Sequence, residues 1–267
     1  MNLKGKTALL SGASRGLGHA LALALDARGC RLCLIARDEA RLTALQQQLR
    51  TPGSRQYRGD LSDPKARACL LQQILAGESR IDLIIHCAGI GSHSLLEQLS
   101  SEEVQQLLQL NSVAPLEMTA ELLPLLPADE SAGIVFVGSM AGELITPGMS
   151  LYSASKHALH AFSRAAAFEL AERGHFSLLV ILGALRDTEF GAAIRQPLTG
   201  QPDWYRRLDV DPRQTAARIV KAIEKEQEKL VIPRWYGLVI TLSRLLSPFT
   251  RFLTRYAFRQ ARPKSDQ

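Results

Sequence analysis

The sequence predicts an α/β fold built on a doubly wound sheet of about seven parallel strands, with helices on both faces. Short apolar runs alternate with longer amphipathic stretches, which is typical of repeated β-α-β units. Two of the runs, Ile134–Val137 and Leu178–Ile181, are apolar at every position, as strands covered on both faces are. The chain has 267 residues, of which 46% are hydrophobic, so one domain of this kind can fill it.

The strands are predicted from these apolar runs, and the stretches between them are predicted to be helices. In chain order the predicted strands are Thr7–Leu10, Arg31–Ala36, Ile81–Cys87, Gly133–Gly138 and Ser177–Leu182, with a last short one at Leu230–Ile232. A further strand, the third in order, is expected before Asp60. Helical sequence begins at His19, and Asp38 is expected to cap the helix that follows the second strand.

The cysteines and the N-terminus bear on the cellular compartment. We expect neither a disulfide framework nor a zinc site, because the cysteines lie in sequence typical of buried strands or helices; they are Cys30, Cys33, Cys69 and Cys87. No signal-type apolar segment precedes the first strand, so a cytoplasmic location is expected. No cluster of His, Cys, Asp and Glu suggests a metal, and His157 and His160 are interpreted as packing or surface residues.

The net charge of +6 is concentrated in the C-terminal tail. Residues 234–267 hold six arginines and one lysine against a single aspartate. Nucleic acid is not the expected partner, because no platform of interleaved aromatic and basic residues appears elsewhere in the chain.

A glycine-rich turn follows the first strand and leads into a helix. Glycines allow a tight turn and a close approach to a pyrophosphate, which the free N–H groups and the dipole of the helix N-terminus favour. The spacing is G-x-x-x-G-x-G, and the residues expected to contact a dinucleotide are Gly12, Ser14, Arg15, Gly16, Leu17 and Gly18. Such a turn can also be an ordinary strand-to-helix connection, so it predicts a cofactor only together with further residues.

Two residues at the start of a long helix indicate acid–base chemistry. Tyr152 and Lys156 are four residues apart and therefore project from one helical face. A phenol with an ordinary pKa of about 10 is a poor acid or base near neutrality, and a nearby ammonium group is expected to lower that pKa. Tyr-x-x-x-Lys by itself is common on exposed helices. Here the pattern indicates a catalytic pair because it follows Asn111 and Ser139, and Ser139 lies at the end of a predicted strand.

Together these motifs resemble the short-chain dehydrogenase/reductase family over about residues 5–232. The resemblance implies a Rossmann fold and a hydride transfer between a nicotinamide and a carbonyl or alcohol. It implies that Tyr152 donates the proton in reduction, and that Lys156 lowers the pKa of Tyr152 and holds the nicotinamide ribose. Ser139 would bind the carbonyl oxygen, and Asn111 would bend its helix and support a water leading to Lys156.

The same resemblance implies further cofactor contacts. Asp60 and Leu61 resemble the family's adenine-contacting pair. The segment His86-Cys87-Ala88-Gly89 resembles the family's Asn-Asn-Ala-Gly, with Cys87 in place of an asparagine, and Cys87, Ala88 and Gly89 are assigned to the cofactor site. Gly183 and Thr188 match the residues near the carboxamide, although Leu182 stands where a proline is usual.

The choice of nicotinamide is predicted from charge. A carboxylate after the second strand would favour NAD, but Ala36 occupies that place and Arg37 follows it. Arg37 and Arg15 could converge on a 2′-phosphate, which predicts NADP(H). The alternative is that both arginines are solvated surface residues.

The sequence specifies the substrate pocket and the C-terminal tail less closely than the cofactor site. An apolar pocket is expected between Met140–Met149 and Leu185–Tyr205, with a lid at about residues 185–212. Polar contacts are expected from Gln98, Glu143, Arg186 or Arg195. After Pro248, apolar and arginine side chains fall on opposite faces of a helix, which predicts contact with anionic lipid, with coverage of the pocket or a subunit interface as alternatives.

These observations predict a catalytic domain at residues 1–233 and an apolar, basic appendage at residues 234–267. The expected activity is NADP(H)-dependent reduction of an apolar or lipid-like ketone or aldehyde, and the resemblance implies a homodimer or homotetramer. Two alternatives stay open: oxidation of a secondary alcohol, and a regulatory protein that binds the cofactor without turnover.

Overall fold

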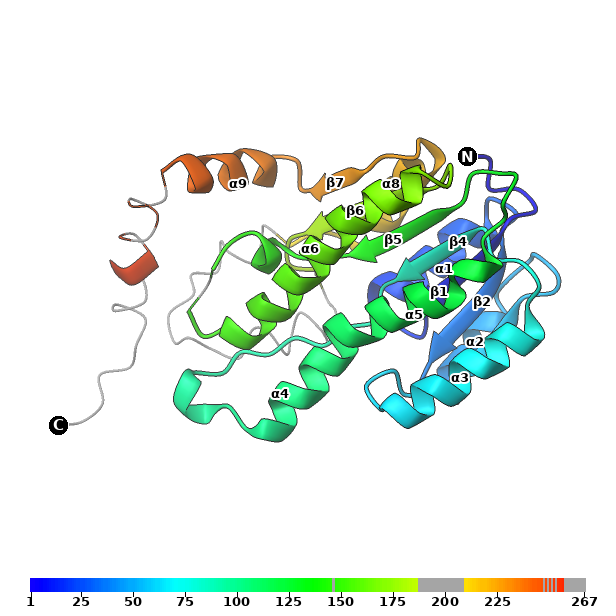
Figure 1. Ribbon diagram of the computed structural model, residues 1–267, viewed down its shortest axis with the longest axis horizontal. Coiled ribbons are helices and arrows are strands. Elements are labelled where there is room, and N and C mark those ends of the chain that lie inside the picture. Colours follow the sequence, from blue (N-terminus) through cyan, green and yellow to red (C-terminus); the bar gives the residue numbers. More distant parts are fainter. Residues whose placement is uncertain are drawn as a thin grey trace.

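The fold is a single seven-stranded parallel sheet between two layers of helices (Figure 1), as seen in a computed structural model that describes residues 1–145, 147–186 and 209–246, together with 248, 250, 252 and 254–256. The strand order is β3-β2-β1-β4-β5-β6-β7. The strands are β1 (Thr7–Ser11), β2 (Arg31–Ala36), β3 (Arg55–Arg58), β4 (Leu83–His86), β5 (Gly133–Val137), β6 (Phe176–Leu182) and β7 (Lys229–Ile232). The predicted fold class is therefore confirmed.

The connections between strands are helical, as parallel pairing requires. The helices are α1 (Gly16–Asp26), α2 (Glu39–Gln46), α3 (Pro64–Gly77), α4 (Ser101–Leu108), α5 (Ala114–Leu122), α6 (Ser150–Ala171), α8 (Pro212–Glu224) and α9 (Tyr236–Leu245). Short helical turns also occur at η1 (Leu96–Gln98), η2 (Gln109–Val113), η3 (Leu123–Leu125) and η4 (Met140–Gly142).

The first helix begins earlier than expected. The sequence predicts helical structure from His19, but α1 starts at Gly16 because the backbone N–H of His19 already bonds to the carbonyl of Arg15, at 3.3 Å. The predicted cap of the next helix is confirmed, since the Asp38 side chain accepts a hydrogen bond from the Arg41 N–H at 3.0 Å.

Two apolar cores lie on opposite faces of the sheet, because side chains of successive strand residues point to opposite faces. One core joins the sheet to α1, α2 and α8; its helical members include Leu21, Leu25, Leu42, Ile219 and Ile223. The other joins the sheet to α3, α5 and α6; its helical members include Leu70, Ile74, Met118, Leu122 and Leu159. The five inner strands, from β2 to β6 in the sheet, are thereby covered on both sides, whereas the edge strands β3 and β7 are partly exposed.

The C-terminal helix α9 packs only in part against this body. It follows β7 at the end of the sheet (Figure 1), and Ile240 is buried in the second core. Several of its apolar neighbours remain exposed, namely Trp235, Leu238, Leu242, Leu245 and Leu246. Within the part of the chain that the structure describes, no helix has the length and apolarity needed to cross a membrane.

The cysteines are free, and two depart from the expectation of burial in strands or helices: Cys69 is exposed, and Cys87 is partly buried just after the end of β4. Cys33 lies buried in β2, and Cys30 is buried at the position just before this strand begins. Cys69 is exposed, because α3 is amphipathic and turns the neighbouring Leu70 and Leu71 toward the core instead.

Candidate functional site

The residues singled out in the sequence gather at the carboxyl edge of the sheet. The strand order reverses between β1 and β4, and ligands of such sheets bind in the crevice beyond the strand ends at this reversal. The glycine turn follows β1, and the segment Cys87–Gly89 follows β4. Ser139 follows β5, and Gly183 follows β6.

The glycine turn leaves no room for side chains at two positions. Gly12 has a φ of +71° and lies against the segment that follows β4, because a Cβ atom there would lie 2.8 Å from the Cα of Ala88. A Cβ atom on Gly18 would lie 2.0 Å from the carbonyl oxygen of Gly12. The glycine turn is therefore folded back on the first turn of α1. The N–H groups of that helical turn have no partner within the helix, and the helix begins at the exposed Gly16.

Ser11 is a site residue that the sequence interpretation missed. Its buried hydroxyl accepts hydrogen bonds from the N–H groups of Cys87, at 3.0 Å, and Ala88, at 3.1 Å. It thereby ties the end of β1 to the end of β4, where the family pattern would have an asparagine at Cys87. The available signal was a polar side chain at the end of an otherwise apolar strand.

Arg37 and Asp60, both expected from the sequence to contact the cofactor, form an ion pair. Arg37 is half exposed after β2, and its Nη1 lies 3.4 Å from Oδ2 of Asp60. Arg15, the cap residue of α1, is also exposed. The backbone carbonyl of Leu61 accepts from the buried Arg67 at 2.6 Å, so Arg67 is a second residue that holds this edge and that the sequence interpretation missed.

Asn111 lies in an irregular helical segment. It is fully buried in η2, a π-helical turn that interrupts the helical run from α4 to α5. Its amide accepts from the Ile90 N–H at 2.9 Å and donates to the Ile90 carbonyl at 2.8 Å. It also donates to the hydroxyl of Ser155 at 3.2 Å, so it joins the loop after β4 to α6.

Tyr152, Lys156 and Ser139 lie close together. The Lys156 ammonium donates to the carbonyl of Val137 at 3.1 Å, and its Nζ lies 5.9 Å from the centre of the Tyr152 ring. The side chains of Tyr152 and Ser139 share a hydrogen bond. Gly89 completes the group, because a Cβ atom there would lie 3.6 Å from the Lys156 ammonium.

Burial controls the protonation of this group. It lowers the pKa of Lys156 to about 8, against a smaller upward effect of Cys87. It raises the pKa of the Tyr152 phenol, and the hydrogen bond with Ser139 acts in the opposite direction. From the sequence, the Lys156 ammonium was expected to lower the pKa of Tyr152, but desolvation of the phenolate outweighs any such effect.

Some residues expected in the substrate pocket bind elsewhere. Glu143 is buried, and its carboxylate contacts His160, Arg164 and Arg244. The side chain of Gln98 accepts from the Leu95 N–H at 3.2 Å. His160 is confirmed as a packing residue, although it also hydrogen-bonds, which the sequence did not indicate.

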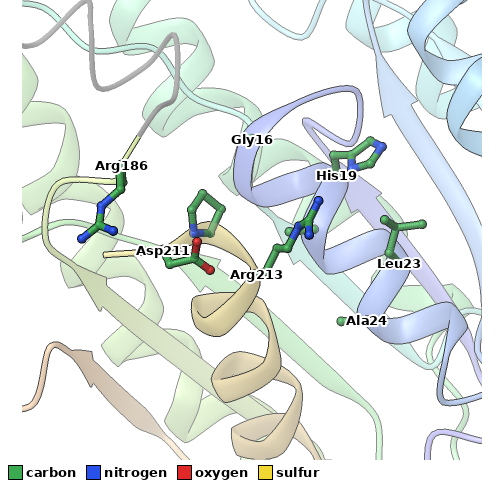
Figure 2. A pocket seen from close by; sticks show the side chains of 9 residues that line it. Gly16, His19, Leu23, Ala24, Arg186, Asp211 and Arg213 are labelled. Atoms are coloured by element: carbon green, nitrogen blue, oxygen red, sulfur yellow. The ribbon is translucent and has the colours of Figure 1, made fainter. Parts of the chain in front are cut away.

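A cavity of about 850 Å³ lies between α1 and the start of α8 (Figure 2), on the opposite face of the sheet from α6. Its lining is Gly16, His19, Ala20, Leu23, Ala24, Arg186, Asp211, Pro212 and Arg213. It shares Gly16 with the glycine turn but includes none of Ser139, Tyr152 and Lys156. Thr188, Arg195 and most of the expected lid lie outside the described residues.

Comparison with known proteins identifies the family. A family model for short chain dehydrogenases matches residues 6–199. The chain is 30% identical over 174 residues to the 3-oxoacyl-[acyl-carrier-protein] reductase FabG of Escherichia coli, covering 65% of this chain and 71% of that protein.

Two solved structures are similar over most of their length. A short-chain dehydrogenase from Sphingobium yanoikuyae in complex with NADPH is 26% identical, with a TM-score of 0.75, over 91% of this chain and 95% of that one. A short-chain dehydrogenase/reductase from Burkholderia phymatum in complex with NAD has the same fold, with 22% identity and a TM-score of 0.80, over 94% and 96% of the two chains. Because the family model spans most of its length, the chain belongs to the short-chain dehydrogenase/reductase family of oxidoreductases.

Proposed function

We propose that this protein is an NADP(H)-dependent oxidoreductase that reduces an apolar ketone or aldehyde to an alcohol. The observation that carries the proposal is the convergence of Ser139, Tyr152 and Lys156 beside the glycine turn, with Asn111 bracing the helix that holds them. A coincidental Tyr-x-x-x-Lys pair would not lie buried at the edge of the sheet where parallel strands bind their ligands.

The turn fits a dinucleotide. Gly12 and Gly18 allow the turn to fold tightly against Ala88 and against itself, and the N–H groups at the start of α1 can receive a pyrophosphate. When bound, a nicotinamide cofactor supplies or accepts the hydride. Lys156 lies against Gly89 at this edge and can bind the ribose hydroxyls with its ammonium group.

The side chains then handle the proton. The Ser139 hydroxyl can donate a hydrogen bond to the substrate carbonyl oxygen and polarise it. Tyr152 can donate its proton to the oxygen as negative charge develops there. Burial raises the pKa of Tyr152, which makes the phenol a weaker acid, so the transfer depends on the negative charge that develops on the substrate oxygen. The alternative, oxidation of a secondary alcohol, would run the same proton transfer in reverse.

An assay of turnover tests this role and the non-catalytic alternative. Purified protein is screened against ketones, aldehydes and 3-oxoacyl thioesters with NADPH oxidation as the readout; the thioesters are included because the E. coli relative is named as a 3-oxoacyl reductase. Tyr152→Phe should lower kcat at least about 100-fold while leaving NADPH affinity nearly unchanged. Tyr57→Phe, at another buried tyrosine, is the matched control. Equal rates for Tyr152→Phe and the parent would disprove the proton-donor role.

The preference for NADP(H) rests on Arg37 and Arg15. Neither the fold nor the relatives select the cofactor, since one similar structure holds NADPH and another NAD. We expect NADPH to bind more tightly than NADH, and Arg37→Asp to weaken NADPH binding about tenfold or more. Arg58→Asp removes an exposed arginine at the end of the neighbouring strand and controls for net charge. Equal affinities of the parent protein for the two nucleotides would contradict the assignment.

The appendage from residue 234 is proposed to touch anionic lipid as a peripheral surface, in a protein that is otherwise cytoplasmic and oligomeric. The exposed apolar stripe of α9 supports this, together with the arginine excess of the tail. Leu238→Glu should reduce sedimentation with anionic vesicles, whereas Leu96→Glu, at an even more exposed leucine on η1, should not. If the parent protein stays in the supernatant when anionic vesicles are sedimented, the proposed lipid contact is wrong.

A further inference from the structure

The turn that carries Ser139 is built around the imidazole ring of His160. A Cβ atom on Gly138 would lie 2.2 Å from Nε2 of His160, and one on Gly142 would lie 2.5 Å from its Cε1. The glycines on both sides of Ser139 thus leave the space that the ring fills. The Ser139 N–H donates to Nε2 of the same ring at 3.3 Å. The position of Ser139 therefore depends on where the ring lies.

The ring is in turn held by a carboxylate. Nδ1 of His160 lies 3.1 Å from Oε1 of Glu143, which follows the same turn. Because Nε2 accepts from the Ser139 N–H, the ring proton is assigned to Nδ1, which donates it to Glu143. Protonation of both nitrogens would set two N–H groups against each other at Ser139.

Two arginines from separate helices hold the carboxylate. Arg164 of α6 and Arg244 of α9 both pair with Glu143, whose side chain is only 1% exposed. Arg244 is 101 residues away in sequence from Glu143 and belongs to the C-terminal helix. Helix α9 also contacts Gly183, the residue after β6, because a Cβ atom on Gly183 would lie 2.5 Å from the ring of Tyr236.

We propose that Arg244, Glu143 and His160 form a chain of positioning residues that sets the place of Ser139, so that helix α9 controls how the site polarises its substrate. The proposal rests on the proposed function, because the role of Ser139 toward the carbonyl belongs to it. None of the three residues touches the reacting atoms. Their effect on the reaction passes through the Ser139 turn.

The protonation states are consistent with this chain. Burial lowers the pKa of His160, although the hydrogen bond with Glu143 acts to raise it. Burial alone would raise the pKa of Glu143, but the hydrogen bond with His160, the charges of the two arginines and, at acid pH, the charge of His160 outweigh it and bring the pKa to about 2. Near neutral pH the chain is therefore arginine cation, carboxylate and neutral imidazole.

Amide hydrogen exchange of the full chain tests the positioning without any substrate. Arg244→Gln should speed exchange of the Ser139 N–H about threefold or more, while the slowest amides of β5 stay unchanged. Arg28→Gln removes another half-exposed arginine, which pairs with Glu224 far from the site, and should leave Ser139 unaffected. Unchanged exchange at Ser139 in Arg244→Gln would overturn the proposal, as would equal changes in both variants.

Turnover of a carbonyl found in the NADPH screen gives a second test. Arg244→Gln should lower kcat about three- to tenfold with the NADPH Kd unchanged, and Arg244→Lys should restore most of the loss. In a Glu143→Gln background, Arg244→Gln should have no further effect, because the two residues act in series. Additive losses would refute the chain. Failure of the whole screen would count against the proposed function, and hydrogen exchange would still decide the positioning role.

Discussion

Replacement of Glu143 by glutamine should reveal how much the buried carboxylate stabilises the fold. The glutamine keeps an acceptor for His160 but removes the charge that Arg164 and Arg244 contact. The pKa of Glu143 falls from its ordinary 4.5 to about 2. Each pKa unit corresponds to about 1.4 kcal/mol, so the upper bound is about 3.5 kcal/mol of stability.

Solvent screening reduces that figure. The side chains of Arg164 and Arg244 are 48% and 58% exposed, so we expect a loss of about 2 kcal/mol near neutral pH. In a chain of this size the loss corresponds to a fall in Tm of about 5 °C. Urea unfolding and thermal melts of parent and variant measure it. Glu130→Gln is the control, because Glu130 also pairs with two cations, Lys6 and Arg80, but lies half exposed.

The sign of the pH dependence follows from the lowered pKa. A carboxyl whose folded pKa lies below its unfolded value stabilises the protein above the unfolded pKa and loses that effect as pH falls through the folded one. The difference between parent and Glu143→Gln should therefore shrink by about 1.4 kcal/mol between neutral pH and about pH 3.5. A difference that stays constant over this range would refute the electrostatic reasoning.

Three further outcomes are expected. Because burial brings the pKa of Lys156 to about 8, kcat should fall above about pH 8 as the ammonium is lost, and Lys156→Arg should move that limb to higher pH; a profile flat to about pH 10 would contradict this. Gly18→Ala should abolish NADPH binding in titration calorimetry, since its methyl group would lie 2.0 Å from the Gly12 carbonyl oxygen. An NADPH affinity equal to that of the parent would show that the backbone of the turn can shift to accept the methyl group. Ser11→Ala should cost about 1–3 kcal/mol in urea unfolding, because two backbone N–H groups, one of them that of Ala88, lose their acceptor. An unchanged urea midpoint for Ser11→Ala would mean that water replaces the Ser11 hydroxyl as the acceptor.

The course of the chain could be predicted from local sequence. Strand burial produces continuous apolar runs, and helix caps such as Asp38 follow local hydrogen bonding, so strand ends differ from the structure by no more than two residues. The candidate site residues were found because they occur at strand ends and at helical spacing, and the carboxyl ends of parallel strands meet at one edge. The start of α1 was wrong by three residues because glycines were assigned to the turn alone.

Sequence by itself therefore determined the sheet, the family and the set of side chains at its edge, because each leaves a periodic or short-range pattern. Only the tertiary structure decided how those side chains are held. Burial, which sets the pKa of Tyr152, is a property of the whole packing and has no local sequence signal. The contact of Arg244 with Glu143 joins residues 101 positions apart, and neither residue type indicates its partner before the chain folds.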